Sequence, residues 1–278
     1  MNRLSIEKRT EIIHFLLEGN SVKGTARVAK VSPTTVLKLL DDVGSMCDFY
    51  LFNNMVKLLC KRLEVDEIWS FCKMKEKRVP AMLKGQLGYG DVYTWVAIDP
   101  DTKLVPCFLV GRRDSSYAME FMDDLAWRLR NRVQLTSDGH SPYLEAVEGA
   151  FGGKIDFAML KKQYGGTRTL PDGTQKKCRR SECSSISKEV ICGKPDFSRV
   201  STSMVERQNL SMRMGMRRFT RKTNAFSKKL WNHKAAVALY FMHYNFARIH
   251  RTLRVTPAME AGLATHVWSI EDIVRLAD

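Results

Sequence analysis

The 278-residue sequence has no uninterrupted apolar run of about 18 or more residues, the length that a membrane-spanning helix requires. Charged side chains also interrupt its first 17 residues, where a secretion signal would need an apolar stretch. Both absences argue against a membrane or secreted protein. We therefore expect a soluble, cytoplasmic protein that makes no use of a membrane.

The sequence also gives no indication that its cysteines form disulfide bonds. The seven cysteines are an odd number, in a chain too long to need disulfide bonds for stability. Cys178, Cys183 and Cys192 lie close together in the sequence, but no C-x-x-C pair or nearby histidine completes a set of zinc ligands. Unpaired thiols in a reducing compartment are the expectation, with a structural zinc as the alternative.

Acidic residues are scarce relative to basic ones. The chain has 45 Lys and Arg against 30 Asp and Glu, which gives a net charge of +15. The basic residues recur in clusters between positions 154 and 234, for example "KKCRR" and "RMGMRRFTRK". Such an excess favours a polyanionic partner, most commonly nucleic acid, over the alternative of a merely basic soluble protein.

The N-terminal part of the sequence has the pattern of three helices. A serine precedes each one, and Ser32 is followed by Pro33 at the first helical position. Two short helices joined by a tight turn are typical of a helix-turn-helix, although such modules also serve as plain packing units. We predict a DNA-binding module over residues 1–42 and a helical linker over 43–62. The predicted base-reading residues are Thr34, Thr35 and Lys38.

From residue 63 the apolar period changes from helical to alternating. "LEVDEIWSF", "DVYTWVAID" and "KLVPCFLVG" predict an antiparallel meander of three strands. A helix, a strand ending in "LTSD", a second helix and a fifth strand follow. This order requires a crossover that returns the fourth strand beside the first. Residues 63–250 are therefore predicted to form a mixed α/β sheet core.

Two later stretches differ from this pattern. Residues 164–200 are rich in Gly, Ser, Thr, Lys and Arg, which predicts a basic loop or inserted hairpin that is only partly ordered without a partner. Helical spacing returns over 203–218 and 228–248. Residues 251–278 are predicted to form a C-terminal tail.

Adjacent carboxylates in "LEVDEIWSF" raise a separate question, because an ionised carboxylate in a buried strand needs compensation. Alternation places Asp66 and Glu67 on opposite faces. Asp138 ends the fourth strand, and Glu206 lies early in a later helix. If the first and fourth strands are neighbours and that helix crosses them, Asp66, Asp138 and Glu206 converge at one end of the sheet.

Three such carboxylates repel one another unless divalent cations lie between them. Hard oxygen ligands suit Mg²⁺ or Mn²⁺, and two such ions can activate a water or a 3′-hydroxyl for attack on a phosphodiester. Taken singly, each acid also fits an ordinary role: an arginine pair for Asp66, a turn cap for Asp138, and a surface pair with Arg213 for Glu206. Glu67 is expected to form an ion pair and is not among the predicted ligands.

Five motifs in order, "VDEIWSF", "AIDPDTK", "TSDGH", "VERQNLSMRMGMRRFTRKTNAFSKK" and "HYNFARIHRTLRVTPAMEAG", resemble a DDE transposase of bacterial insertion sequences. They are most similar to the insertion-sequence-one (IS-one) group. The resemblance implies a ribonuclease H-like core and a catalytic metal triad of Asp66, Asp138 and Glu206, which would hold two Mg²⁺ ions, or Mn²⁺. The zinc finger common ahead of the helix-turn-helix in that group has no counterpart before Asp66.

The resemblance also implies a basic residue two helical turns after the glutamate, here Arg213, which would hold phosphate near the metals. Further phosphate contacts along the DNA are expected from Arg207, Arg217, Arg218, Arg221 and Lys222.

The expected function is transposition: cleavage at insertion-sequence ends and transfer of the 3′-hydroxyl strand into target DNA. Synapsis of two ends implies a homodimer or larger assembly on DNA. Two alternatives remain open. One is a catalytically silent helix-turn-helix regulator derived from a transposase, and the other is a structure-specific nuclease on the same fold.

Overall fold

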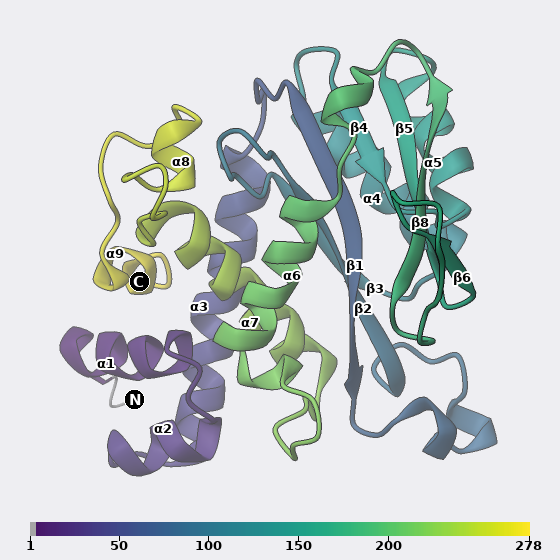
Figure 1. Ribbon diagram of the computed structural model, residues 1–278. Coiled ribbons are helices and arrows are strands. Elements are labelled where there is room, and N and C mark those ends of the chain that lie inside the picture. Colours follow the sequence, from purple (N-terminus) through teal and green to yellow (C-terminus); the bar gives the residue numbers. More distant parts are fainter. Residues whose placement is uncertain (1–3) are drawn as a thin grey trace.

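A six-stranded mixed sheet forms the centre of the computed structural model, which describes residues 4–278 (Figure 1). The strand order is β3-β2-β1-β4-β5-β8. Three strands pair antiparallel as β3-β2-β1, β4 and β5 run parallel to β1, and β8 pairs antiparallel with β5. The strands are β1 (Arg62–Cys72), β2 (Gly90–Ile98), β3 (Cys107–Gly111), β4 (Gln134–Ser137), β5 (Asp156–Tyr164) and β8 (Cys183–Cys192).

The arrangement of these strands confirms the predicted crossover. The first and fourth strands are neighbours, and they pair only from Arg62↔Gln134 to Glu64↔Thr136. Beyond Glu64, no strand pairs with β1 on that side until Cys72 forms a bridge with Ser227, which leaves an open edge past the end of β4. An antiparallel meander followed by two parallel strands, with helices on both faces, is the ribonuclease H-like arrangement.

Helices cover both faces of the sheet, as Figure 1 shows. α4 (Ser115–Arg128) and α5 (Pro142–Phe151) lie on one face, and α6 (Ser203–Gly215) crosses β1 on the other. Large apolar side chains between these layers are fully buried, among them Trp95, Phe121 and Phe157. Burial on both faces explains why the central strands have nearly continuous apolar runs.

The basic stretch after β5 is more ordered than its composition predicts. Residues 164–200 contain the expected hairpin, formed by β6 (Thr167–Thr169) and β7 (Gln175–Lys177), but β8 in the same stretch is the sixth strand of the main sheet. The expectation of a partly ordered insertion is therefore wrong for β8. β8 pairs with β5 from Phe157↔Cys192 to Tyr164↔Cys183, with two shifts of register, and polar side chains do not prevent such backbone pairing at a sheet edge.

The three N-terminal helices begin where the sequence predicts. The serines at 5, 21 and 32 cap α1 (Ile6–Leu17), α2 (Val22–Val28) and α3 (Pro33–Asn54) by accepting a backbone N–H in each first turn. α3 continues through the expected boundary at residue 42 and packs on α7 (Leu230–Met242). A Cβ atom at Gly44 would lie 2.4 Å from the Ala235 carbonyl oxygen, so the two helices touch backbone to backbone here.

The last residues also pack on the core. The chain leaves α7 through a π-helical turn at residues 243–247, then forms α8 (Pro257–Glu260) and α9 (Ile270–Arg275). α9 lies beside α1, where Arg9 Nη1 and Asp278 Oδ1 form an ion pair of 2.6 Å, and it buries Ile273 and Val274. Among residues 4–278, no helix combines the length and apolarity needed to cross a membrane.

Candidate active site

One cavity, with a volume of about 670 Å³, is lined by the three acids that the sequence predicts to converge. Asp66 comes from the part of β1 that pairs with β2 but extends past the end of β4, Asp138 follows directly after β4, and Glu206 lies in the first turn of α6. They meet because β4 ends where the open edge of β1 begins and α6 crosses that edge. The remaining lining residues include Arg113, His140, Lys161, Lys162, Tyr164 and Thr202.

Asp66 is held by two hydrogen bonds. Its Oδ2 accepts one of 2.8 Å from the Asn209 side-chain amide, and its Oδ1 accepts one of 2.8 Å from the backbone N–H of Glu67. Burial raises the pKa of Asp66 to about 6, and the nearby charge of Asp138 adds to this effect. A buried carboxylate in this position gains more from a bound cation than an exposed one would.

Asp138 and Glu206 are more exposed than Asp66. Asp138 Oδ1 accepts a 2.9 Å hydrogen bond from the backbone N–H of His140, which fixes the turn after β4. Glu206 forms an ion pair with Lys162 on β5 and accepts a 2.7 Å hydrogen bond from the Thr202 hydroxyl. No ion pair joins Glu206 to Arg213, so the simple surface pair considered from the sequence does not form between these two described residues.

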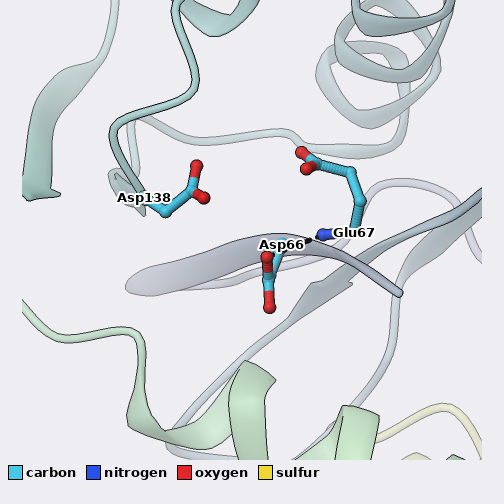
Figure 2. A group of neighbouring side chains, drawn as sticks. All are labelled: Asp66, Glu67 and Asp138. Atoms are coloured by element: carbon cyan, nitrogen blue, oxygen red, sulfur yellow. Dashed lines mark hydrogen bonds between the residues drawn. The ribbon is translucent and has the colours of Figure 1, made fainter. Parts of the chain in front are cut away.

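Glu67 lies closer to the predicted acids than strand alternation indicates. Its side chain is only 1% exposed and forms the expected arginine pair, with Arg113 Nε 2.8 Å from its Oε2. Carboxylate oxygens of Asp66, Glu67 and Asp138 nevertheless all lie within 4.8 Å of one another (Figure 2). Both faces of β1 are reachable from Asp138, because no strand covers that edge. Glu206 lies outside this close group.

The structure adds residues that the sequence did not point to. Arg113, directly after β3, contacts Glu67 and also places its Nη2 atom 3.8 Å from Asp138 Oδ2. Lys162 meets Glu206 across the cavity. Position alone does not distinguish these two cations among the 45 Lys and Arg of the chain, so no sequence signal could have selected them. Asn209 could have been noticed, since it lies one helical turn after Glu206.

The residues predicted to contact DNA fall into two groups. In α3, Thr34 and Lys38 are exposed, and Thr35 is half-buried with its hydroxyl 2.9 Å from that of Ser32. Around the end of α6, four of the predicted basic residues are exposed or half-buried at the surface. These four are Arg207, Arg213, Arg217 and Arg221, with Lys222 exposed beside them.

Arg218 differs from its neighbours in this basic segment. Its guanidinium turns inward and donates a 3.1 Å hydrogen bond to Ser227 Oγ. Burial lowers the pKa of Arg218 to about 10. This contact gives Arg218 a structural role in the fold. Arg213, by comparison, has its pKa lowered by burial and by Arg221, and it lies within electrostatic range of Asp66.

The donor set suits a hard divalent cation. The atoms of Asp66, Glu67 and Asp138 that lie within 4.8 Å of one another are all carboxylate oxygens, which Mg²⁺ and Mn²⁺ prefer. Histidine and cysteine do not contribute to this group. All seven cysteines are free thiols, as expected.

A scan against protein-family models gives no match, and a search of curated proteins gives none either. Solved structures similar to this chain include the Mos1 strand transfer complex, at 14% identity with a TM-score of 0.25, covering 56% of this chain and 59% of that one. The Mos1 transposase paired-end complex with left transposon end has 14% identity, a TM-score of 0.24 and coverages of 56% and 60%. The piggyBac transposase synaptic complex with hairpin DNA has 11% identity, a TM-score of 0.41 and coverages of 98% and 69%.

The chain therefore spans less than two thirds of the length of the two Mos1 chains. Its own strand order and pairing define its fold.

Proposed function

We propose that this chain is a DDE-type DNA transposase of the insertion-sequence-one group, which cleaves element ends and joins the 3′-hydroxyl to target DNA. One observation carries the proposal: Asp66, Asp138 and Glu206, from three elements far apart in the sequence, line a single cavity at the open edge of β1. An acidic centre rimmed with cations suits a reaction on a phosphodiester, whose backbone is anionic and whose transition state spreads that charge further.

In this proposal Asp66 and Asp138 hold a divalent cation between them, and Glu206 contributes a third carboxylate from α6. When bound, a pair of such cations activates a water or 3′-hydroxyl and stabilises the leaving oxygen. The chain's own part is to keep these oxygens in place. Asn209 fixes Asp66, the backbone N–H of His140 fixes Asp138, and Thr202 fixes Glu206.

The cations around the cavity have a second task. Lys162 and Arg113 each touch one of the acids and also face the space where a DNA phosphate would lie. Both can exchange a carboxylate contact for a phosphate contact, because charge-assisted hydrogen bonds to either anion are similar. We propose that these two residues draw the scissile phosphate into the cavity and orient it for in-line attack.

DNA would approach from two sides. We propose that Thr34, Thr35 and Lys38 of α3 read the element end, and that the basic segment at the end of α6 contacts phosphates without sequence preference. That segment comprises Arg207, Arg213, Arg217, Arg221 and Lys222. Synapsis of two ends would make the working unit a dimer or larger.

The test uses labelled duplexes cut from the DNA that flanks the gene on either side. Purified protein with Mg²⁺ should cleave the strand at one end of these duplexes and join the freed 3′-end to a plasmid. Asp66→Asn, Asp138→Asn and Glu206→Gln should each lose both steps and retain DNA binding. The matched control is Glu148→Gln, at an exposed glutamate of α5 that does not line the cavity, and it should keep full activity.

Other outcomes separate the alternative functions. Cleavage without joined products indicates a nuclease on the same fold. Binding to the flanking DNA without cleavage, in either Mg²⁺ or Mn²⁺, indicates a regulator that no longer catalyses. Activity that survives in all three carboxylate variants contradicts the proposed site.

A further inference from the structure

Glu67 is a buried acid with one oxygen unaccounted for. Its Oε2 pairs with Arg113, whereas its Oε1 is buried and forms no hydrogen bond of full geometry. The Tyr143 hydroxyl lies beside Glu67 and interacts with it, but neither this buried hydroxyl nor His140 Nε2 forms a hydrogen bond of full geometry. Three buried polar atoms with incomplete hydrogen bonding in one neighbourhood are costly, unless something else in the site satisfies them.

The position of Glu67 indicates what that partner is. Figure 2 shows its carboxylate turned toward that of Asp138, above the strand that carries Asp66. Oxygens of the three residues lie within 4.8 Å of one another, so small side-chain movements would bring them to the distance of about 2.1 Å at which oxygen ligands bind one Mg²⁺. A single guanidinium, that of Arg113, serves Glu67 and Asp138 together. Arg113 alone does not balance the negative charge of these three neighbouring carboxylates, so the cluster can bind a further cation.

We propose that Glu67 is an additional ligand of the divalent cation held by Asp66 and Asp138. The inference rests on the proposed function, since it adds a carboxylate to that metal site. It assigns Oε1 to the cation and leaves Oε2 on Arg113. A hydrated Mg²⁺ or Mn²⁺ keeps several waters, and those waters would complete the hydrogen bonding of the Tyr143 hydroxyl and His140 Nε2.

A competing role for Glu67 is to anchor Arg113, and the two roles predict opposite results for Arg113. If Glu67 is a ligand, Glu67→Gln weakens cation binding, whereas Arg113→Gln removes a repelling charge and leaves binding equal or tighter. If Glu67 only positions Arg113, Glu67→Gln and Arg113→Gln behave alike. The sign of the Arg113→Gln effect therefore separates them.

The experiment is a titration of the full chain with Mn²⁺, followed by electron paramagnetic resonance of free Mn²⁺ and by calorimetry. Glu67→Gln should lower the affinity by about tenfold or more, and Arg113→Gln should not lower it. Glu148→Gln, at an exposed glutamate of α5 that does not line the cavity, serves as the matched control. Unchanged affinity in Glu67→Gln, or equal losses in both variants, overturns the inference.

Two further variants keep the result interpretable. Asp66→Asn tests the proposed metal site itself: if it loses affinity while Glu67→Gln does not, only the role of Glu67 fails. If neither loses affinity, the metal site fails as a whole. Should Glu67→Gln not fold, as judged by circular dichroism without Mn²⁺, Glu67→Asp keeps the charge on a shorter side chain. It should also bind Mn²⁺ more weakly than the parent, and parent-like affinity would contradict the inference.

Discussion

The side-chain amide of Asn209 donates a 2.8 Å hydrogen bond to Asp66 Oδ2 and so ties α6 to β1. Asn209 is itself buried, at 3% exposure, and lies one turn after Glu206 on the same helix. Glu64 on β1 adds to this contact, because its Oε2 accepts hydrogen bonds of 2.7 and 3.1 Å from the backbone N–H groups of Met204 and Val205 in α6. The helix that carries one predicted acid is therefore held against the strand that carries another.

Replacing Asn209 should weaken both the fold and the site. Asn209→Ala leaves Asp66 with the backbone N–H of Glu67 as its remaining donor, and loss of a hydrogen bond to a charged group costs about 1.5–3 kcal/mol. Urea unfolding in the absence of metal measures this loss. Asn224 is exposed, so the control variant Asn224→Ala should change the free energy of unfolding by less than about 0.5 kcal/mol. Equal stability of the two variants would show that the Asn209 contact contributes nothing.

The contact between α3 and α7 predicts a strong effect at a single glycine. Gly44→Ala places a methyl group 2.4 Å from the Ala235 carbonyl oxygen, so the helices must separate. We expect this overpacking to lower the free energy of unfolding by about 1–3 kcal/mol, measured by urea unfolding. A methyl group added at Gly149 in α5 would meet no atom within 4 Å, so Gly149→Ala should raise the free energy of unfolding by about 0.5–1 kcal/mol. A neutral Gly44→Ala would contradict the close packing.

Lys162 should contribute to DNA binding through its charge. Lys162→Gln removes one cation beside Glu206. In a plot of the logarithm of the DNA association constant against the logarithm of the salt concentration, we expect the slope to become less steep by about 1. Fluorescence anisotropy with labelled duplex at several salt concentrations measures that slope. Lys154 is an exposed lysine at the opposite end of β5, so Lys154→Gln is the control and should leave the slope unchanged. Identical slopes for the two variants would remove Lys162 from the DNA surface.

Arg217 and Arg218 are adjacent in sequence but should behave differently. Arg217 is exposed, and Arg217→Ala should weaken DNA binding with little effect on unfolding. Arg218 donates to Ser227, so Arg218→Ala should lower the free energy of unfolding by about 1–3 kcal/mol. Both quantities are measured on both variants, by urea unfolding and by anisotropy. If Arg217→Ala destabilises the fold as much as Arg218→Ala, the assignment is wrong.

His233 makes stability depend on pH. Its Nε2 lies 3.3 Å from Ser70 Oγ and its Nδ1 lies 2.8 Å from Ser227 Oγ. Ser70 donates to the Val92 carbonyl, so its oxygen is left to accept from the imidazole, which makes the neutral ring with a proton on Nε2 the fitting form. Burial, together with the nearby Arg218 charge, lowers the pKa of His233 to about 3.

The sign of this effect follows from linkage. An unfolded histidine has a pKa of about 6.5, so the unfolded state binds the proton first as pH falls. Stability should decrease below pH about 6.5 by up to about 1.4 kcal/mol per pH unit from this residue. Asp66 and Glu67, whose pKa values are raised, act in the opposite direction, but they do so equally in the parent and in His233→Gln.

The measurement is the difference in unfolding free energy between the parent and His233→Gln, by urea denaturation from pH 7 to pH 5. That difference should shift in favour of the variant by about 2 kcal/mol over this range. A difference that does not change with pH would show that His233 has the same pKa in the folded protein as in the unfolded chain.

Local pattern was enough to predict most of the elements. Period-two alternation marked β1, β2 and β5, and the serines at 5, 21 and 32 marked three helix starts, because alternation and capping depend on residues only a few positions apart. The order of the strands also predicted the pairing of β1 with β4, since a parallel neighbour needs a crossover. From that pairing came the expectation that Asp66, Asp138 and Glu206 approach one another.

The tertiary structure decided what depends on contacts between distant segments. Edge pairing made β8 a strand despite its polar composition, and packing on α7 made α3 one long helix. The partners of the acids were also set this way: which of 45 cations reaches Glu206 or Glu67, and whether Glu67 meets Asp138 around an open strand edge. The sequence by itself determined which acids this chain carries and on which elements; burial and charge pairing act through space, so only the folded chain decided what surrounds them.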